Sequence, residues 1–343
     1  MHLFHEVTLT AADLDATEKV VAELTARFTS VEEEGFQRTA AVAAHELPKD
    51  LRAALYEFTL TESAPGCLVR GFEVDDRAIG VTPGDWREEP AATSTLREEV
   101  FFYLCAQLVA EPVAWATQQN GRVMHDILPI RGYENQQVGA GSKTLLAWHT
   151  EEAFHPLRAD YIALMCLRNH DCVETTYADV TGARLSAEDE QELRRPQYRI
   201  RPDPSHLERS NLPRAEEVPA WLLEESYRWN QECDEHPEPV AVLFGSADTP
   251  YLRIDPEFMQ PPPTAAAARA LGSLVAQIES AMSGFALAPG EILFVDNFRA
   301  VHGRVAFEPR YDGTDRWLKR LNLVRDLRKS RGNRVAATDR VIY

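Results

Sequence analysis

The feature that most constrains the fold is a series of short apolar runs, separated by turn signals, that fills residues 111–343. Runs of this kind are typical of strands in a sandwich or jelly roll. Asn120-Gly121 lies between two such runs and predicts a hairpin, and Pro289-Gly290 predicts a turn before another strand. The other strand candidates are TLLAWHTEEAF, ADYIALMCLR, PVAVLFG, YLRID, EILFVDN and WLKRLNLV.

Residues 1–110 show a different pattern, in which helices are mixed with a strand. Thr10 and Asp13 form a threonine-x-x-acid capping box that predicts a helix start, and further helices are expected after Pro48 and from Thr95. The stretch GCLVRGFEV between them predicts a strand. We expect this part to form a scaffold for the strand-rich part.

Two segments interrupt the strand series. Residues 205–236 are polar and in part helical, and residues 264–282 predict a helix. Since no internal repeat is visible, we expect one α+β domain over residues 1–343, with a jelly-roll core at 111–343 decorated by helices. The segment at about 205–236 is expected to form a lid that excludes water, with ordinary surface as the alternative.

Composition excludes several classes of protein. The net charge of −18 argues against a nucleic-acid partner and favours a cationic ligand, although acidic surfaces also simply improve solubility. Without a long apolar run or a targeting pattern, the chain is expected to be cytoplasmic and to have no membrane partner. The five cysteines form no metal or redox motif and are expected to be reduced.

The stretch TLLAWHTEEAFHP contains the first candidate for chemistry. In a strand, His149 and Glu151 would share one face and Thr150 and Glu152 the other. A neutral imidazole beside a carboxylate offers two metal ligands, although an isolated pair is more often a core histidine and a surface acid. His302, in DNFRAVHGR, is the candidate third ligand of a two-histidine, one-carboxylate site for iron(II).

Two arginines follow at a spacing that also suggests a site. Arg316 and Arg320 are four apart in a predicted strand, so both would point to the same side. Arginine binds carboxylates through two parallel hydrogen bonds, as the far end of an α-keto acid cosubstrate would require. The alternative is that both are surface residues.

Several motifs together resemble one family. WHTEEAFHPLRADY, VETT, DNFRAVHGR and RYDGTDRWLKRLN are similar to the clavaminate synthase-like iron(II)/2-oxoglutarate oxygenases, most of all to hydroxylases of free L-arginine in antibiotic biosynthesis. The resemblance covers nearly the whole chain and implies a double-stranded β-helix (jelly roll). It also implies that the enzyme uses iron(II), with 2-oxoglutarate and O2 as cosubstrates. The implied metal ligands are His149, Glu151 and His302. The implied contacts with 2-oxoglutarate are Arg316 and Thr175.

The resemblance also assigns contacts with a small amino acid substrate. It implies that Gln118 and Glu151 hold the substrate amine and that Arg320 holds its carboxylate. Two carboxylates, Asp255 and Glu257, match the pair that binds the side-chain cation, and Asp203 matches a third acid that closes over it. From the residues alone, two acids in an extended segment form a fork for a guanidinium, whereas a solvated turn is the alternative.

The chain departs from this pattern at Glu257, where an aspartate is expected, so the length or ring state of the substrate stays open. C3 hydroxylation of L-arginine with release of succinate and CO2 is the first expectation. The alternatives are C4 hydroxylation, dihydroxylation or desaturation of arginine, β-hydroxylation of enduracididine, and a jelly-roll binding protein without turnover. Halogenating relatives have a small residue at the position of Glu151, which leaves room for chloride. The resemblance therefore implies that this chain does not halogenate. His155 is expected to shape the turn at Pro156, and His125 to be a core or cavity-wall residue.

Overall fold

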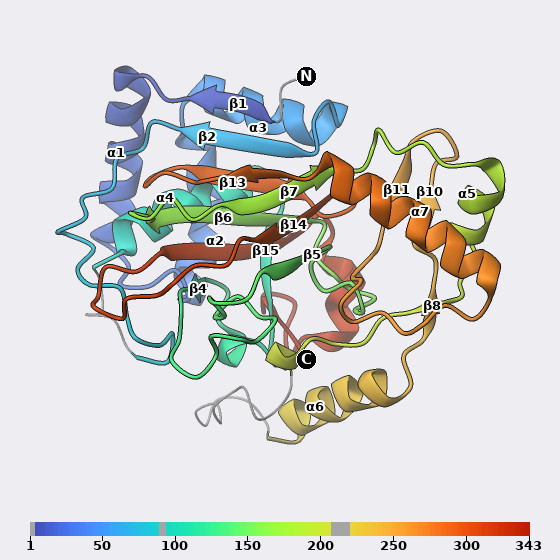
Figure 1. Cartoon of the computed structure of the whole chain (residues 1–343). Coiled ribbons are helices and arrows are strands. Elements are labelled where there is room, and N and C mark those ends of the chain that lie inside the picture. Colours follow the sequence, from blue (N-terminus) through green and yellow to red (C-terminus); the bar gives the residue numbers. More distant parts are fainter. Residues whose placement is uncertain (1–3, 89–93, 207–219) are drawn as a thin grey trace.

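The computed structural model describes residues 4–88, 94–206 and 220–343, and its helices and strands are mixed along the chain. An eight-stranded sheet, the large sheet, has the order β1-β2-β13-β6-β15-β3-β16, with β4 also paired to β15 (Figure 1). A four-stranded sheet, the small sheet, has the order β12-β7-β14-β5. The strands of the large sheet are His5–Thr8 (β1), Gly66–Arg70 (β2), Glu111–Trp115 (β3), His125–Ile127 (β4), Tyr161–Arg168 (β6), Ile292–Asp296 (β13), Trp317–Val324 (β15) and Val341–Ile342 (β16). Those of the small sheet are Leu146–His149 (β5), Thr175–Asp179 (β7), Ser283–Phe285 (β12) and Ala300–Arg304 (β14).

The described part of the chain also has two further pairs of short strands, seven α-helices and several short 3-10 helices. The pairs are β8 with β9 and β10 with β11, namely Tyr198–Arg199, Pro239–Val240, Leu243–Gly245 and Pro250–Leu252. The helices are Ala11–Thr25 (α1), Glu34–Ala43 (α2), Lys49–Thr61 (α3), Leu96–Gln107 (α4), Ala187–Leu193 (α5), Ala220–Glu235 (α6) and Ala265–Ala281 (α7). No described helix is long and apolar enough to cross a membrane.

Local capping explains where several helices begin. The expected capping box is present at α1, where the Thr10 hydroxyl accepts from the Asp13 backbone N–H and the Asp13 carboxylate accepts in return. The helices expected after Pro48, from Thr95 and at 264–282 are confirmed. Helix α2 was not expected. Its buried residues, Phe36, Gln37, Ala40 and Ala43, recur at helical spacing, but only Phe36 is a large apolar residue.

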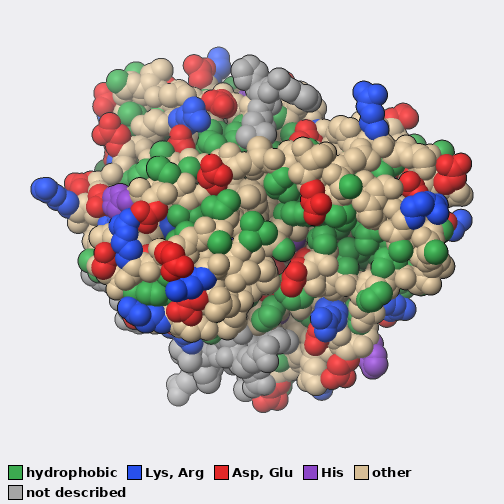
Figure 2. All heavy atoms as spheres, viewed as in Figure 1, with side chains coloured by type: hydrophobic (Ala, Val, Ile, Leu, Met, Phe, Trp, Pro, Cys, Tyr) green, Lys and Arg blue, Asp and Glu red, His purple; other side chains and the backbone are tan. Residues whose placement is uncertain are grey.

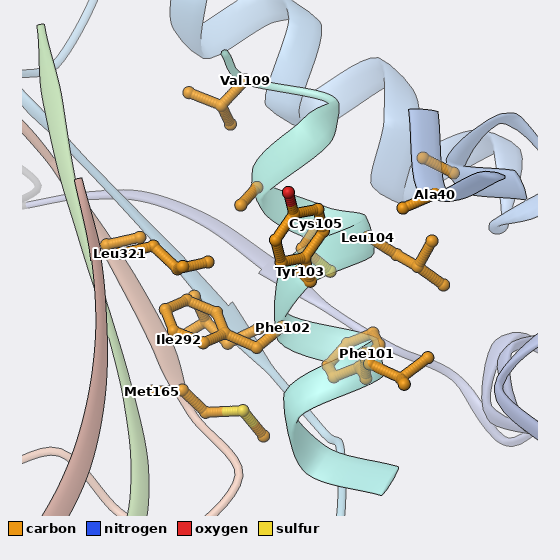
Figure 3. Close-up of a cluster of buried hydrophobic side chains, with 14 of the residues drawn as sticks. Ala40, Phe101, Phe102, Tyr103, Leu104, Cys105, Val109, Met165, Ile292 and Leu321 are labelled. Carbon is orange, nitrogen blue, oxygen red and sulfur yellow. The ribbon is translucent and has the colours of Figure 1, made fainter. Parts of the chain in front are cut away.

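The layers follow from the alternation of side chains along the strands. Outward residues of the large sheet, such as Met165, Ile292 and Leu321, pack against α1 to α4. Figure 3 shows Phe102 of α4 directed toward Ile292 and Leu321. Inward residues, such as Leu164, pack against Tyr177 of the small sheet. The outer face of the small sheet packs against α7, so two sheets form a sandwich with helices on both sides.

The expected hairpin around Asn120-Gly121 is wrong. Asn120 and Gly121 do adopt the left-handed backbone that turn residues favour, with φ of 57° and 70°. However, β3 and β4 pair with different parts of β15 and not with each other. The local turn signal was therefore correct, while the pairing is set by a strand far along the chain.

The segment expected to form a lid is described only in part, because residues 207–219 lie outside the described residues. Its described helix, α6, lies at the edge of the molecule below β8 in Figure 1. On the described face in Figure 2, acidic and basic side chains lie intermixed, as is typical of a solvated surface.

Candidate active site

Three potential ligands converge where the two inner strands of the small sheet pair. His149 ends β5 and lies opposite His302 in the middle of β14. Oε2 of Glu151 is 3.6 Å from Nε2 of His149 and 3.3 Å from Nε2 of His302. Their ligand atoms all lie within 4.8 Å of one another. The three residues expected together are thus brought together.

The backbone reason for this convergence differs from the one expected. The strand ends at His149, so Glu151 lies in a turn and not on the same strand face. Thr150 fixes the turn through its N–H and hydroxyl, which both donate to the Ile254 carbonyl. Asn297 accepts from the Glu151 N–H at 2.7 Å and donates to its carbonyl at 3.0 Å. Sequence reasoning missed Asn297, whose only signal was its place in DNFRAVHGR.

The donor set fits a divalent metal of the iron(II) type. Nδ1 of His149 lies 2.8 Å from the Ala147 carbonyl, so a proton on Nδ1 leaves the Nε2 lone pair facing Glu151. Burial opposes ionisation of Glu151, yet Arg320 and the two histidines hold its pKa well below the usual range. Burial likewise opposes a charged His149, but Glu151 and Asp255 raise its pKa to about 9, so metal binding at Nε2 would release a proton. Two imidazoles and one ionised carboxylate are the ligands that non-haem iron(II) favours.

Arg316 is a buried guanidinium with no carboxylate partner in the described part of the chain. Its Nη2 donates to the hydroxyl of Thr175 at 3.2 Å, while its Nε is buried without a hydrogen bond. Burial lowers the pKa of Arg316 to about 10. An unpaired buried cation is costly, so this position favours an anionic ligand. The expected pairing of Arg316 with Thr175 is therefore present in the geometry.

Arg320 lies in the middle of β15 and has other partners. It forms an ion pair with Glu151, and its Nη2 donates to Oε1 of Gln118 at 3.2 Å and lies 2.8 Å from Nδ1 of His125. Burial and Arg320 hold the pKa of His125 well below the usual range, so His125 is neutral and accepts. His125 is a cavity-wall residue, one of the two positions expected for it.

The three expected acids line the same cavity, which has a volume of about 160 Å³. Asp255 is buried, and burial together with Asp203 raises its pKa to about 6, although His149 acts in the opposite direction. Glu257 is exposed at the cavity wall. The expectation of an extended segment is wrong, because residues 256–258 form a turn that the Phe258 N–H closes on Asp255.

Two acidic neighbours of the metal site take positions that strand alternation did not predict. Glu152 has a left-handed backbone with φ of 53° and lines the cavity beside Glu151, not the opposite face. Its carboxylate contacts His206, which sequence reasoning missed. His155 does shape the turn at Pro156, because its Nδ1 accepts from the Leu157 N–H at 3.0 Å.

Comparisons with known proteins agree with this geometry. Residues 98–322 match the family described as "Taurine catabolism dioxygenase TauD, TfdA family". The chain is 48% identical to enduracididine beta-hydroxylase of Streptomyces hygroscopicus, over 96% of this chain and 97% of the relative. It is 42% identical to L-ornithine/L-arginine 3-hydroxylase of Catenulispora acidiphila, over 99% and 100% of the two chains.

A solved structure extends the likeness to three dimensions. The non-heme iron oxygenase OrfP in complex with Fe, succinate and (3S)-hydroxy-L-Arg superposes with a TM-score of 0.92 at 40% identity. The superposition covers 98% of this chain and 99% of OrfP. The chain therefore belongs to the TauD/TfdA family of iron(II)- and 2-oxoglutarate-dependent dioxygenases, which confirms the family expected from the sequence motifs.

Proposed function

We propose that the protein hydroxylates a free guanidino amino acid, first of all L-arginine at C3, while 2-oxoglutarate is converted to succinate and CO2. The observation that carries this proposal is the lining of the cavity. Two arginines, Arg316 and Arg320, and the carboxylates of Asp203, Asp255 and Glu257 all line it. The cavity thus suits two carboxylates and one cationic side chain.

In this proposal His149, Glu151 and His302 hold the iron. Iron(II) bound there supplies the activation of O2 that hydroxylation of an unactivated carbon needs. The histidines come from paired strands, and Asn297 holds the Glu151 backbone on both sides. This framework keeps the ligand atoms together before a metal arrives.

Arg316 and Thr175 are proposed to bind the distal carboxylate of 2-oxoglutarate. A guanidinium binds such a carboxylate through two parallel hydrogen bonds, and the Thr175 hydroxyl orients the guanidinium. Arg316 is buried and has no carboxylate partner among the described residues. The distal carboxylate of 2-oxoglutarate would supply that partner.

Arg320, Gln118 and Glu151 are proposed to bind the α-carboxylate and α-amine of the substrate. Arg320 contacts Glu151 and Gln118, so the amino acid head binds directly beside the metal ligand. Asp255 and Glu257, with Asp203, then bind the guanidinium. A substrate held by its head beside Glu151 presents the carbons nearest its α carbon to the metal, which favours C3 over C4.

A cyclic guanidino amino acid is a second candidate. Glu257 has one methylene more than the aspartate expected at its position and lies exposed on a turn, so its carboxylate can follow a side chain of different shape. The relative at 48% identity is named enduracididine beta-hydroxylase. Attack at C4, dihydroxylation or desaturation of arginine are further outcomes of the same arrangement.

We also assign the two-sheet sandwich to the double-stranded β-helix, in one domain over residues 1–343. The assignment is supported by the antiparallel pairs of β13 with β6 and of β14 with β7, whose inward side chains share one core. Residues 203–206 and helix α6 are proposed to cover the cavity when substrate binds, because Asp203 and Ser205 line it and Asn230 of α6 contacts Thr117.

The test uses purified protein with iron(II) and 2-oxoglutarate under anaerobic conditions, followed by O2 and a panel of amino acids. A visible charge-transfer band and succinate release stimulated by arginine are the expected results. If neither is observed, the protein is a binding protein with this fold and not an enzyme. Stimulation by lysine or asparagine in place of arginine would remove Asp255 and Glu257 as a guanidinium site.

A further inference from the structure

A second cluster of titratable side chains lies beside the metal site. Glu152, Asp203 and His206 bring potential ligand atoms within 4.8 Å of one another, and the side chains of Glu152 and His206 are completely buried. Nε2 of His206 contacts a carboxylate oxygen of Glu152, and its Nδ1 lies 2.9 Å from the hydroxyl of Thr117. Both ring nitrogens are therefore engaged, and these hydrogen bonds hold the imidazole in place.

The backbone of Glu152 is arranged for this contact. It follows Glu151 directly and has a φ of 53°, a left-handed conformation that is strained for a glutamate. The turn is closed by the His155 N–H, which donates to the Glu152 carbonyl at 2.8 Å. The strained turn sends two adjacent carboxylates in different directions, Glu151 toward the metal ligands and Glu152 toward His206.

The segment around His206 also contacts the other side of the metal site, so the contacts form a ring. Glu151 pairs with Arg320, and Arg320 donates to Gln118. Gln118 donates in turn to the Ser205 hydroxyl at 2.9 Å, next to His206. His206 then contacts Glu152, which returns the ring to Glu151 through one peptide bond.

Helix α6 packs on the same ring. Nδ2 of Asn230 donates to the Thr117 hydroxyl at 3.2 Å, and the ring of Trp229 lies 4.7 Å from that of His155. Thr117, His206 and the turn after Glu151 therefore form the surface on which α6 rests. A displacement of α6 or of residues 203–206 would reach Glu151 through these contacts.

We propose that the Glu152–His206 pair is a latch that couples closure over the substrate cation to the position of Glu151 and Arg320. This inference rests on the proposed function and deepens it, because Asp203, which precedes the latch, is one of the acids proposed to bind the guanidinium. Glu152 and His206 are positioning residues and do not touch the reacting atoms. Through the latch, Arg320, Gln118 and Glu151 take the positions that bind the head of the substrate only when its cationic end is also bound.

The test compares E152Q, H206Q and the double variant with wild type. Each single variant is expected to raise KM for arginine about tenfold and to increase the succinate formed per hydroxylated product. Iron content and KM for 2-oxoglutarate are expected to stay at wild-type values. The double variant is expected to resemble the single ones, because both remove one interaction. R228Q is the matched control, since Arg228 lies on the exposed side of α6 and pairs only weakly with Glu225 at 3.7 Å.

Three results would overturn the latch. The first is an E152Q enzyme with wild-type KM and wild-type coupling of succinate to product. The second is a loss of all kinetic parameters in proportion to Tm, which would make the pair a stabilising contact only. The third is a second metal ion per chain that disappears in E152Q. If wild type itself forms no succinate in response to arginine, the proposed function fails and the latch with it.

Discussion

The two ends of the cavity are built differently. At the metal and 2-oxoglutarate end, His302 and Thr175 lie within β14 and β7, which pair with each other, and Arg316 immediately precedes β15. Glu151 lies in a turn there, but Asn297 holds its backbone on both sides. At the substrate end, Asp255 and Glu257 lie in a turn and Asp203 precedes a short 3-10 helix. Groups on paired strands are held more tightly than groups on turns. The first end is therefore suited to an invariant reaction, and the second to a choice among substrates.

The comparison predicts the largest effect for a metal ligand. H302A is expected to lose bound iron and to lower turnover by about a thousandfold or more, because no other described ligand can replace a histidine held within β14. Iron content after dialysis and succinate formation measure this. H170A is the control, since His170 is half exposed on the surface. Iron retained at the wild-type level in H302A would remove His302 from the ligand set.

The next largest effect, about a hundredfold on KM for 2-oxoglutarate, is expected for Arg316, which is proposed to bind that cosubstrate. R316Q should raise KM for 2-oxoglutarate by about a hundredfold, because it removes both charge and paired hydrogen bonds from a buried site. KM for the amino acid should change little. Initial rates with either compound varied separate the two, and R310Q, which alters an exposed arginine paired with Asp171, is the control. An equal rise in both KM values would contradict the separation of the two ends.

A smaller effect is expected at the turn and depends on pH. Asp255 has a pKa of about 6, raised from 3.8 mainly by burial. It is ionised above that value, so affinity for a guanidinium should fall as pH decreases, with KM for arginine rising about tenfold from pH 7 to pH 5. D255N should show a KM about thirtyfold above wild type at pH 7 and little of this pH dependence.

In the free protein, the contribution of Asp255 to stability changes with pH in the opposite direction to its contribution to arginine affinity. Because the folded pKa of Asp255 is raised, its contribution to stability is present at low pH and lost as pH rises through about 6. A bound guanidinium offsets that loss, so arginine should raise Tm more at pH 7.5 than at pH 5. A Tm increase that is larger at pH 5 would show that Asp255 does not meet the cation.

The smallest effect is expected at the exposed acid. E257D should change the ratio of kcat/KM for arginine to that for a cyclic guanidino amino acid by about threefold, because solvent screens an exposed carboxylate. Competition between the two substrates in one reaction measures the ratio directly. A change of a hundredfold would mean that Glu257 is enclosed when substrate binds.

The residues of the metal end were largely predictable from the sequence, but strand alternation alone does not explain how they come together. Strand alternation placed His149 with Glu151, and the structure brings them together although β5 ends at His149. The turn that does this depends on Asn297, a contact between residues far apart in sequence. Such contacts leave no local pattern.

The substrate end was less predictable, because turns obey no periodicity. Alternation placed Glu152 away from Glu151, whereas its left-handed backbone turns it into the same cavity. The contact of Glu152 with His206 joins residues far apart in the chain and has no sequence signal. Resemblance supplied Asp255 and Glu257, but their turn became visible only in three dimensions.

The central claim is that the iron end hydroxylates an amino acid whose two ends are both held by the protein. NMR and mass spectrometry of the product formed from L-arginine, together with the succinate released in the same reaction, test it most directly. We predict one added oxygen atom at C3 and one succinate per hydroxylated arginine. Unchanged arginine, with succinate formed at the same rate in its absence, would contradict the account.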